Sequence, residues 1–141
     1  MTITATLSAL PHVAPVCDHA RLVLFAIRRM GAHGLSDARA AHGFLTAFGE
    51  GFCRPLTLAR ALMADVAATS SMPISIAPCC CSRMTASEQA LLTILARVEQ
   101  APVSASLLMA DLLGHRRVEG VLASAAALAA AFADEGRPIS A

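Results

Sequence analysis

The 141-residue sequence contains no lysine, asparagine, tryptophan or tyrosine, and only 15% of its residues are charged. Because 56% of the residues are hydrophobic, the sequence is not that of an intrinsically disordered protein. The eleven basic residues, all arginine, nearly cancel the ten acidic residues and leave a net charge of +1. This balance argues against a protein that binds nucleic acid through a basic surface. At this length we expect a single domain with one core.

The sequence also lacks a long apolar run. The longest weakly polar segment, Val121–Ala133, is mostly alanine and is shorter than the about 20 apolar residues that span a membrane. Residues 1–10 have neither the positive charge nor the apolar stretch of a signal peptide. Five cysteines, three of them adjacent, do not resemble a disulfide framework. We therefore expect a cytoplasmic protein with reduced thiols and no membrane span.

Helical periodicity and capping signals predict a mainly α-helical bundle. Asp18 is a candidate cap for the first helix, and Thr85-Ala86-Ser87-Glu88 has the pattern of a capping box before the fourth. We expect a helical domain over residues 18–135, preceded by a strand and linker over 1–17 and followed by a tail over 136–141. The six predicted helices cover about residues 18–30, 36–48, 55–69, 87–100, 104–113 and 117–135.

Two segments carry the alternating pattern of strands. Thr2–Leu7 alternates threonine with apolar residues, and Met72–Ala77 places Ile74 and Ile76 two residues apart between prolines. A lone strand leaves its backbone groups unpaired, so we expect these two segments to form one short two-stranded β-pair. The alternative is that Met72–Ala77 pairs with the same segment of a second subunit.

The most informative local feature is the triplet Cys79, Cys80 and Cys81, which follows Pro78 and precedes a helix N-terminus. Thiols near such a terminus are more acidic and more reactive. The triplet therefore predicts a redox site or a site for a soft metal ion, Zn or Cu, and no other cofactor is expected. Adjacent cysteines lack the spacing of standard zinc sites, so further ligands are needed, and the candidates are Cys17 and His19, with His12 as a fourth ligand. The alternative is that the cysteines pack as small buried hydrophobes.

Positive charge gathers at the end of the first predicted helix. Arg28, Arg29 and His33, together with Arg39, form a candidate anion site. Phosphate, however, usually binds at helix N-termini, whereas these residues come at a C-terminal end. The alternative is that they complement the negative end of the helix dipole.

The first predicted helix carries apolar residues on both faces. Arg21 and Arg28 bracket Leu24 and Phe25 on the face opposite the expected core side. Because a solvated face does not normally carry Leu and Phe, we expect these four residues to form an interface with a second copy of the chain or another protein. The alternative is that another helix of the same chain covers them.

No pattern for dinucleotide binding, phosphate binding, zinc-protease chemistry or a nucleophile elbow is present, and no catalytic residue is predicted. The sequence favours a non-enzymatic interaction or regulatory module that acts as a homodimer. The alternative function is a thiol-based soft-metal or redox-sensing protein. A further hypothesis is a small-ligand pocket lined by Met30, Phe44, Phe48 and Met63.

Two segments carry a resemblance to a known family. Leu22–Leu35, with the sequence LVLFAIRRMGAHGL, and Ala77–Thr85, with the sequence APCCCSRMT, resemble a family of short bacterial proteins known only as a domain of unknown function. The resemblance extends from about Arg21 to Pro138. It implies a small, free-standing cytosolic protein and brings no activity, cofactor or catalytic residue with it.

Overall fold

The computed structural model describes residues 10–140. This range contains six α-helices, one short 3-10 helix and one antiparallel β-pair, which confirms the prediction of a mainly α-helical fold with a two-stranded pair. The elements are β1 (His12–Val13), α2 (Asp18–His33), α3 (Ala38–Phe48), η1 (Gly49–Phe52), α4 (Cys53–Thr69), β2 (Arg83–Met84), α5 (Ala86–Arg97), α6 (Pro102–Leu113) and α7 (Glu119–Asp134).

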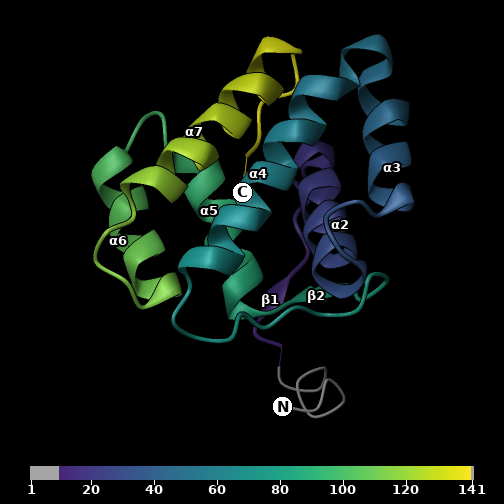
Figure 1. The fold of residues 1–141 in the computed structure, drawn as a ribbon. Coiled ribbons are helices and arrows are strands. Elements are labelled where there is room, and N and C mark those ends of the chain that lie inside the picture. Colours follow the sequence, from purple (N-terminus) through teal and green to yellow (C-terminus); the bar gives the residue numbers. More distant parts are fainter. Residues whose placement is uncertain (1–9, 141) are drawn as a thin grey trace.

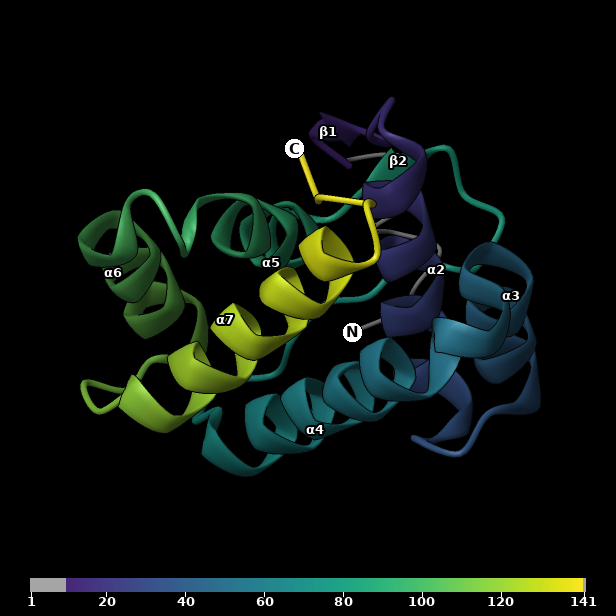
Figure 2. The same ribbon diagram turned by 90° about the horizontal axis from the view of Figure 1, so that it is seen from above.

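The helices pack in pairs around one core. Helix α4 packs mainly against α7, and α5 packs mainly against α6. Helix α2 contacts α3, α4 and α5, and so joins the two pairs (Figures 1 and 2). The β-pair lies at the lower end of the molecule in Figure 1, near the start of α5. Helix α2 therefore runs from the core to the segment that carries the cysteine triplet.

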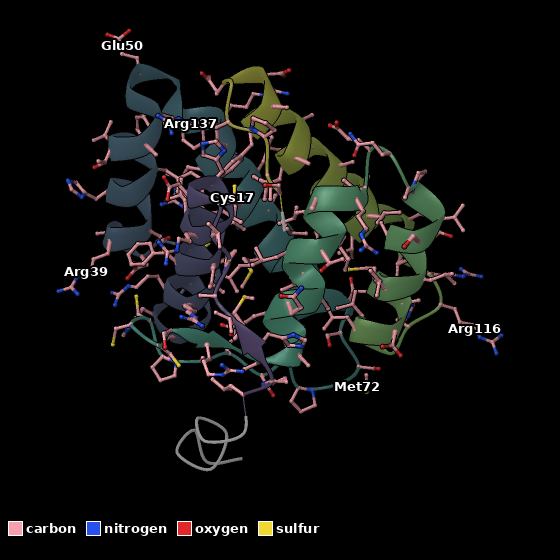
Figure 3. All side chains as sticks on the ribbon, turned by 180° about the vertical axis from the view of Figure 1, so that it is seen from behind. Cys17, Arg39, Glu50, Met72, Arg116 and Arg137 are labelled. Carbon is pink, nitrogen blue, oxygen red and sulfur yellow. The ribbon has the colours of Figure 1, made fainter. Side chains whose placement is uncertain are left out.

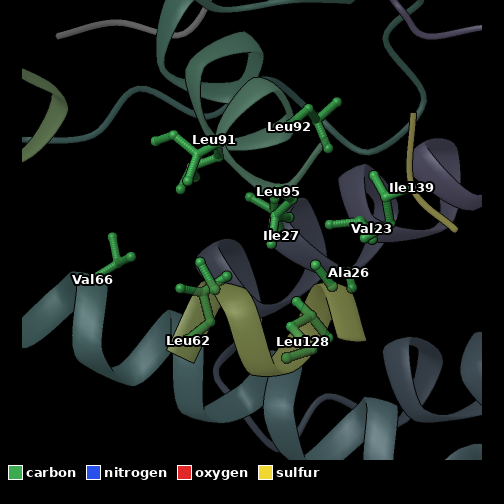
Figure 4. Close-up of a cluster of buried hydrophobic side chains, with 14 of the residues drawn as sticks. Val23, Ala26, Ile27, Leu62, Val66, Leu91, Leu92, Leu95, Leu128 and Ile139 are labelled. Atoms are coloured by element: carbon green, nitrogen blue, oxygen red, sulfur yellow. The ribbon is translucent and has the colours of Figure 1, made fainter. Parts of the chain in front are cut away.

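All six of the α-helices described above contribute apolar side chains to the core. Figure 4 shows side chains from α2, α4, α5 and α7 meeting in one cluster, closed by Ile139 from the C-terminal segment. Phe44 and Phe132 pack edge to face, with ring centroids 5.9 Å apart. Phe44 is fully buried and Met30 is 3% exposed, so these two residues of the hypothesised ligand pocket are ordinary core residues.

Side-chain caps mark the starts of α3 and α5. Thr85 accepts a hydrogen bond from the backbone N–H of Glu88, and Glu88 accepts one from the backbone N–H of Thr85, which confirms the capping box. Asp37 caps α3 by accepting a hydrogen bond from the backbone N–H of Ala40. In contrast to the prediction, Asp18 is the first residue of α2, and Cys17 is its N-cap.

The position of the β-pair differs from the prediction. His12 pairs with Met84 and Val13 with Arg83, so Met72–Ala77 is not a strand. Its proposed partner, Thr2–Leu7, lies outside the described residues. The backbone of residues 72–77 is bonded by side chains instead, because Ser75 O accepts from the Thr85 hydroxyl and Ala77 N–H donates to Glu88 Oε2.

Across residues 10–140, no helix combines the length and the apolar character needed to cross a membrane.

Candidate functional site

A buried ion pair lies between α2 and α5. The Nε of Arg28 donates to Glu88 Oε2 at 2.8 Å, and its Nη2 donates to Glu88 Oε1 at 3.2 Å. The Arg28 side chain is 3% exposed and that of Glu88 is fully buried. Taking two charges out of water is costly, so such a pair is maintained only when the remaining donors and acceptors are also bonded.

Those remaining groups are bonded by the backbone around the cysteine triplet. Arg28 Nη1 donates to Cys81 O and its Nη2 donates to Arg83 O, both at 2.8 Å. Glu88 accepts from the backbone N–H of Ala77 at 3.2 Å and from that of Thr85 at 2.9 Å. The ion pair therefore holds the chain on both sides of the triplet.

The triplet itself forms a surface turn. Cys81 N–H donates to Pro78 O at 3.1 Å, which places Cys79 and Cys80 at the centre of a β-turn. Cys79 and Cys80 are exposed, and Cys81 is half-buried. The interpretation of Cys79 and Cys80 as small buried hydrophobes is therefore wrong.

The turn separates two cavities. One has a volume of about 500 Å³ and is lined by residues that include Arg29, His33, Ile76 and Cys79. The other has a volume of about 440 Å³, and its lining includes Arg21, Phe25 and all three cysteines. Cys79 and Arg28 line both cavities, so Cys79 is accessible from two sides.

The structure does not assemble the proposed metal-ligand set. Cys17 lies at the start of α2, eleven residues before Arg28 and so about 16 Å along the helix from it. His19 donates through Nδ1 to Pro138 O at 2.9 Å. Among residues 10–140, no group of three or more His, Cys, Asp or Glu side chains is placed to hold a metal ion.

Cys17 has an environment of its own at the N-terminus of α2 (Figure 3). Burial raises the pKa of its thiol, but hydrogen bonds from the Ser140 side chain and from the backbone N–H groups of Ala20, Ser140 and His19 lower that pKa to about 7. The thiol is therefore more acidic than an ordinary cysteine, although it lies apart from the triplet.

The structure brings three of the four residues of the proposed anion site together, since Arg28, Arg29 and His33 line one cavity, but the two arginines are already paired with carboxylates. Arg29 forms two hydrogen bonds with the Asp37 carboxylate, at 2.8 and 3.0 Å, and this hydrogen bonding lowers the pKa of Asp37 to about 2. Arg28 is paired with Glu88, and Arg39 extends outward from α3 (Figure 3). Both central arginines are thus neutralised by carboxylates of the chain itself.

The proposed interface is largely internal. Leu24 is 4% exposed and Arg28 is 3% exposed, so the prediction that they face a partner is wrong. Phe25 is half-buried, and its ring packs against Gly43 of α3. Arg21 alone of the four is exposed. Other elements of the same chain cover this face, as the alternative interpretation expected.

Glu88 is the functional residue that the sequence did not reveal. The capping box by itself explains an acidic residue at position 88. The neighbouring sequence therefore gives no sign that Glu88 also binds Arg28. Arg28 and Glu88 are 60 positions apart, and only the fold brings them together.

Comparison with known proteins places the chain among relatives of unknown activity. Residues 3–128 match the model of a family described as a family of unknown function, DUF6628. The chain belongs to this family. The match confirms the resemblance to an uncharacterised family, although it starts and ends earlier in the chain than expected. No curated protein and no solved structure matches the chain.

Replacing Arg28 by methionine is expected to lower the free energy of unfolding by about 3–5 kcal/mol, because the Glu88 carboxylate remains buried without its counterion. Urea denaturation at pH 7 measures this loss. The double variant R28M/E88M is expected to be less destabilised than the sum of the two single variants.

Arg54→Met is the matched control, because its ion pair with Asp134 is exposed, with side-chain exposures of 57% and 64%. Its effect should stay below about 1 kcal/mol. An R28M protein as stable as R54M would contradict the structural importance of the buried pair.

Proposed function

We propose that this protein is a thiol-based redox sensor that uses the turn of Cys79, Cys80 and Cys81. One observation carries the proposal. Two exposed thiols lie on a turn whose following backbone, at Cys81 and Arg83, is bonded to a fully buried ion pair. Redox-sensing cysteines are typically solvent-accessible and lie next to a second cysteine that resolves the oxidised form. The turn meets both requirements.

Backbone geometry favours Cys79 and Cys81 as the pair that forms a disulfide. Neighbouring residues have Cα atoms about 3.8 Å apart, which is shorter than the about 4.4–6.8 Å usual across a disulfide. Residues two positions apart are separated by at most about 7 Å in an extended chain, and a turn shortens this distance. This range of Cα separations is compatible with a disulfide between Cys79 and Cys81.

The chemistry is a two-electron oxidation by a peroxide. The Cys79 thiolate attacks one peroxide oxygen, an S–O bond forms, the O–O bond breaks, and the departing oxygen takes up a proton. The resulting sulfenic acid reacts with the Cys81 thiol, forming the disulfide and releasing water. Two thiols are thus oxidised while one peroxide is reduced, and cellular thiols reverse the reaction by exchange.

Oxidation of the turn is expected to affect the buried ion pair of Arg28 and Glu88. A disulfide that includes Cys81 repositions the Cys81 carbonyl, which is the acceptor for Arg28 Nη1. A buried donor that loses its acceptor destabilises the folded state. Oxidation at the surface is therefore transmitted to the contact between α2 and α5.

Redox chemistry is better supported than metal binding. A structural zinc ion requires four ligands, and residues 10–140 contain no cluster of three candidate ligands. The arginines that border the turn are bonded to carboxylates and backbone oxygens, and this arrangement holds the turn without a metal ion.

We expect one equivalent of hydrogen peroxide to form a Cys79–Cys81 disulfide within the monomer, detected as the loss of two hydrogen atoms by mass spectrometry. Cys79→Ser and Cys81→Ser abolish this product, whereas Cys80→Ser retains it. The thermal midpoint of the wild-type protein should fall after oxidation, because Arg28 loses its Cys81 acceptor.

Cys53→Ser is the control, since Cys53 is also exposed but lies at the start of α4. Its disulfide and its change in thermal midpoint should equal those of the wild type. If the peroxide oxidises Cys79 no faster than Cys53, or if no disulfide forms, the proposal is wrong.

Self-association is a second candidate function, and a different surface supports it. On α6, Val103 is 73% exposed and Leu107 is 68% exposed, and residues four apart are neighbours on a helix face. Val103 and Leu107 thus form a small exposed apolar patch, and such a patch favours contact with another molecule. We therefore propose a homodimer through α6 in place of the buried face of α2.

Sedimentation equilibrium at tens of micromolar tests the dimer. We expect the wild-type protein to be dimeric and Leu107→Glu to be monomeric, because a buried unpaired carboxylate disfavours association. Leu45→Glu is the matched control on α3, where Leu45 is 45% exposed, and it should stay dimeric. A monomeric wild-type protein would exclude this second function.

A further inference from the structure

We infer that the oxidant sensed by the cysteine turn is an alkyl hydroperoxide, whose alkyl chain binds in an apolar groove beside the turn. The inference rests on the proposed redox function, because it names the oxidant of the same thiols. Three observations support it: the lining of the groove, its junction with the cavity at Cys79, and the neutralisation of the charges around that cavity.

The groove has a volume of about 280 Å³ and lies between α2, α4, α5 and the segment 70–76. Ile27, Val66 and Leu91 contribute to its lining and are at most 3% exposed, so the groove reaches the core. Figure 4 shows Val66 and Leu91 extending toward each other from α4 and α5. Among the described residues in its lining, Ser70 alone is polar, and its hydroxyl donates to Met72 O.

Such a lining favours an alkyl chain. A volume of about 280 Å³ has room for an alkyl chain of several carbon atoms. Each methylene that leaves water for an apolar site strengthens binding by a factor of about four. The half-buried Met63 side chain in the lining is flexible, which lets the groove fit chains of different shape.

The groove adjoins the larger cavity that contains Cys79. Gly31, Ile74 and Ile76 line both spaces. A Cβ at position 31 would overlap Ile76 Cδ1, so glycine is what allows Ile76 to lie against α2 at this junction. The groove and the Cys79 cavity therefore meet at Gly31 and Ile76, and Cys79 lines the cavity on the far side of this junction.

The charges around the Cys79 cavity favour a neutral head group. Arg29 is bonded to Asp37, and Arg28 is bonded to Glu88. The positive charges of these two arginines are thus balanced within the chain, so the arginines offer a carboxylate or phosphate little net attraction. A hydroperoxide is neutral, polar at one end and apolar at the other, which matches the two adjoining spaces.

The reaction is the one already described, with an alkyl group on the leaving oxygen. The Cys79 thiolate attacks the terminal oxygen, the S–O bond forms and the O–O bond breaks. The alkoxide takes up a proton and leaves as an alcohol. Cys81 then displaces water from the sulfenic acid to give the disulfide.

The test compares n-octyl hydroperoxide, tert-butyl hydroperoxide and hydrogen peroxide as oxidants of the reduced protein, each rate divided by that for free cysteine. We expect the normalised rate constant for n-octyl hydroperoxide to exceed that for tert-butyl hydroperoxide at least tenfold. Ala67 lines the groove, so Ala67→Phe should abolish this advantage by filling the groove and should leave the rate with hydrogen peroxide unchanged.

Ala68→Phe is the matched control, because Ala68 is exposed on the same helix but is absent from the lining of the groove. It should keep the wild-type preference. A second measurement needs no variant: 1-octanol should slow the reaction of n-octyl hydroperoxide and leave that of hydrogen peroxide unchanged.

The outcomes separate the two proposals. Equal normalised rates for the three oxidants, with disulfide formation intact, would overturn the alkyl hydroperoxide and leave the redox function standing. Failure of every oxidant to form the disulfide would overturn both. An octyl preference that survives Ala67→Phe and is insensitive to 1-octanol would also exclude the groove as its source.

Discussion

The fold around the cysteine turn depends on the buried ion pair of Arg28 and Glu88. Desolvating these charges is costly, and the cost is offset by a bonded set in which Arg28 also reaches two backbone oxygens and Glu88 two backbone N–H groups. Each of these four hydrogen bonds holds a different residue of the segment 77–85 in place. One charge pair thus joins α2, α5 and a segment that has little regular secondary structure of its own.

This arrangement explains how the cysteines can be both exposed and well positioned. A turn without such support would sample many conformations, and its thiols would rarely adopt the geometry of a disulfide. Here the Cys81 carbonyl is bonded to Arg28 while the sulfurs of Cys79 and Cys80 remain accessible. In the proposed redox function, this contact is the link between the chemical state of the turn and the packing of α2 on α5.

Features encoded by neighbouring residues could be predicted from the sequence, whereas features that join distant residues could not. The helical periodicity and the Thr85–Glu88 capping box are local, and both are present in the structure. The β-pair was misplaced because side chains from the capping box bond the backbone of residues 72–77. Leu24 was assigned to an interface because its covering elements cannot be recognised from the pattern of one helix. The ion pair of Arg28 with Glu88 could not be predicted, because the two residues are 60 positions apart and the capping box already explains Glu88.

Native-state hydrogen exchange of the Ala77 and Thr85 amides in the reduced protein tests the account most directly, since both donate to Glu88. The account predicts slow exchange of both amides, close to that of the α5 core, although Ala77 lies in an irregular segment. Protection of both should be lost in Arg28→Met before the protein unfolds globally. Exchange at the rate of an unprotected loop in the reduced wild type would contradict the claim that the buried pair fixes the cysteine turn.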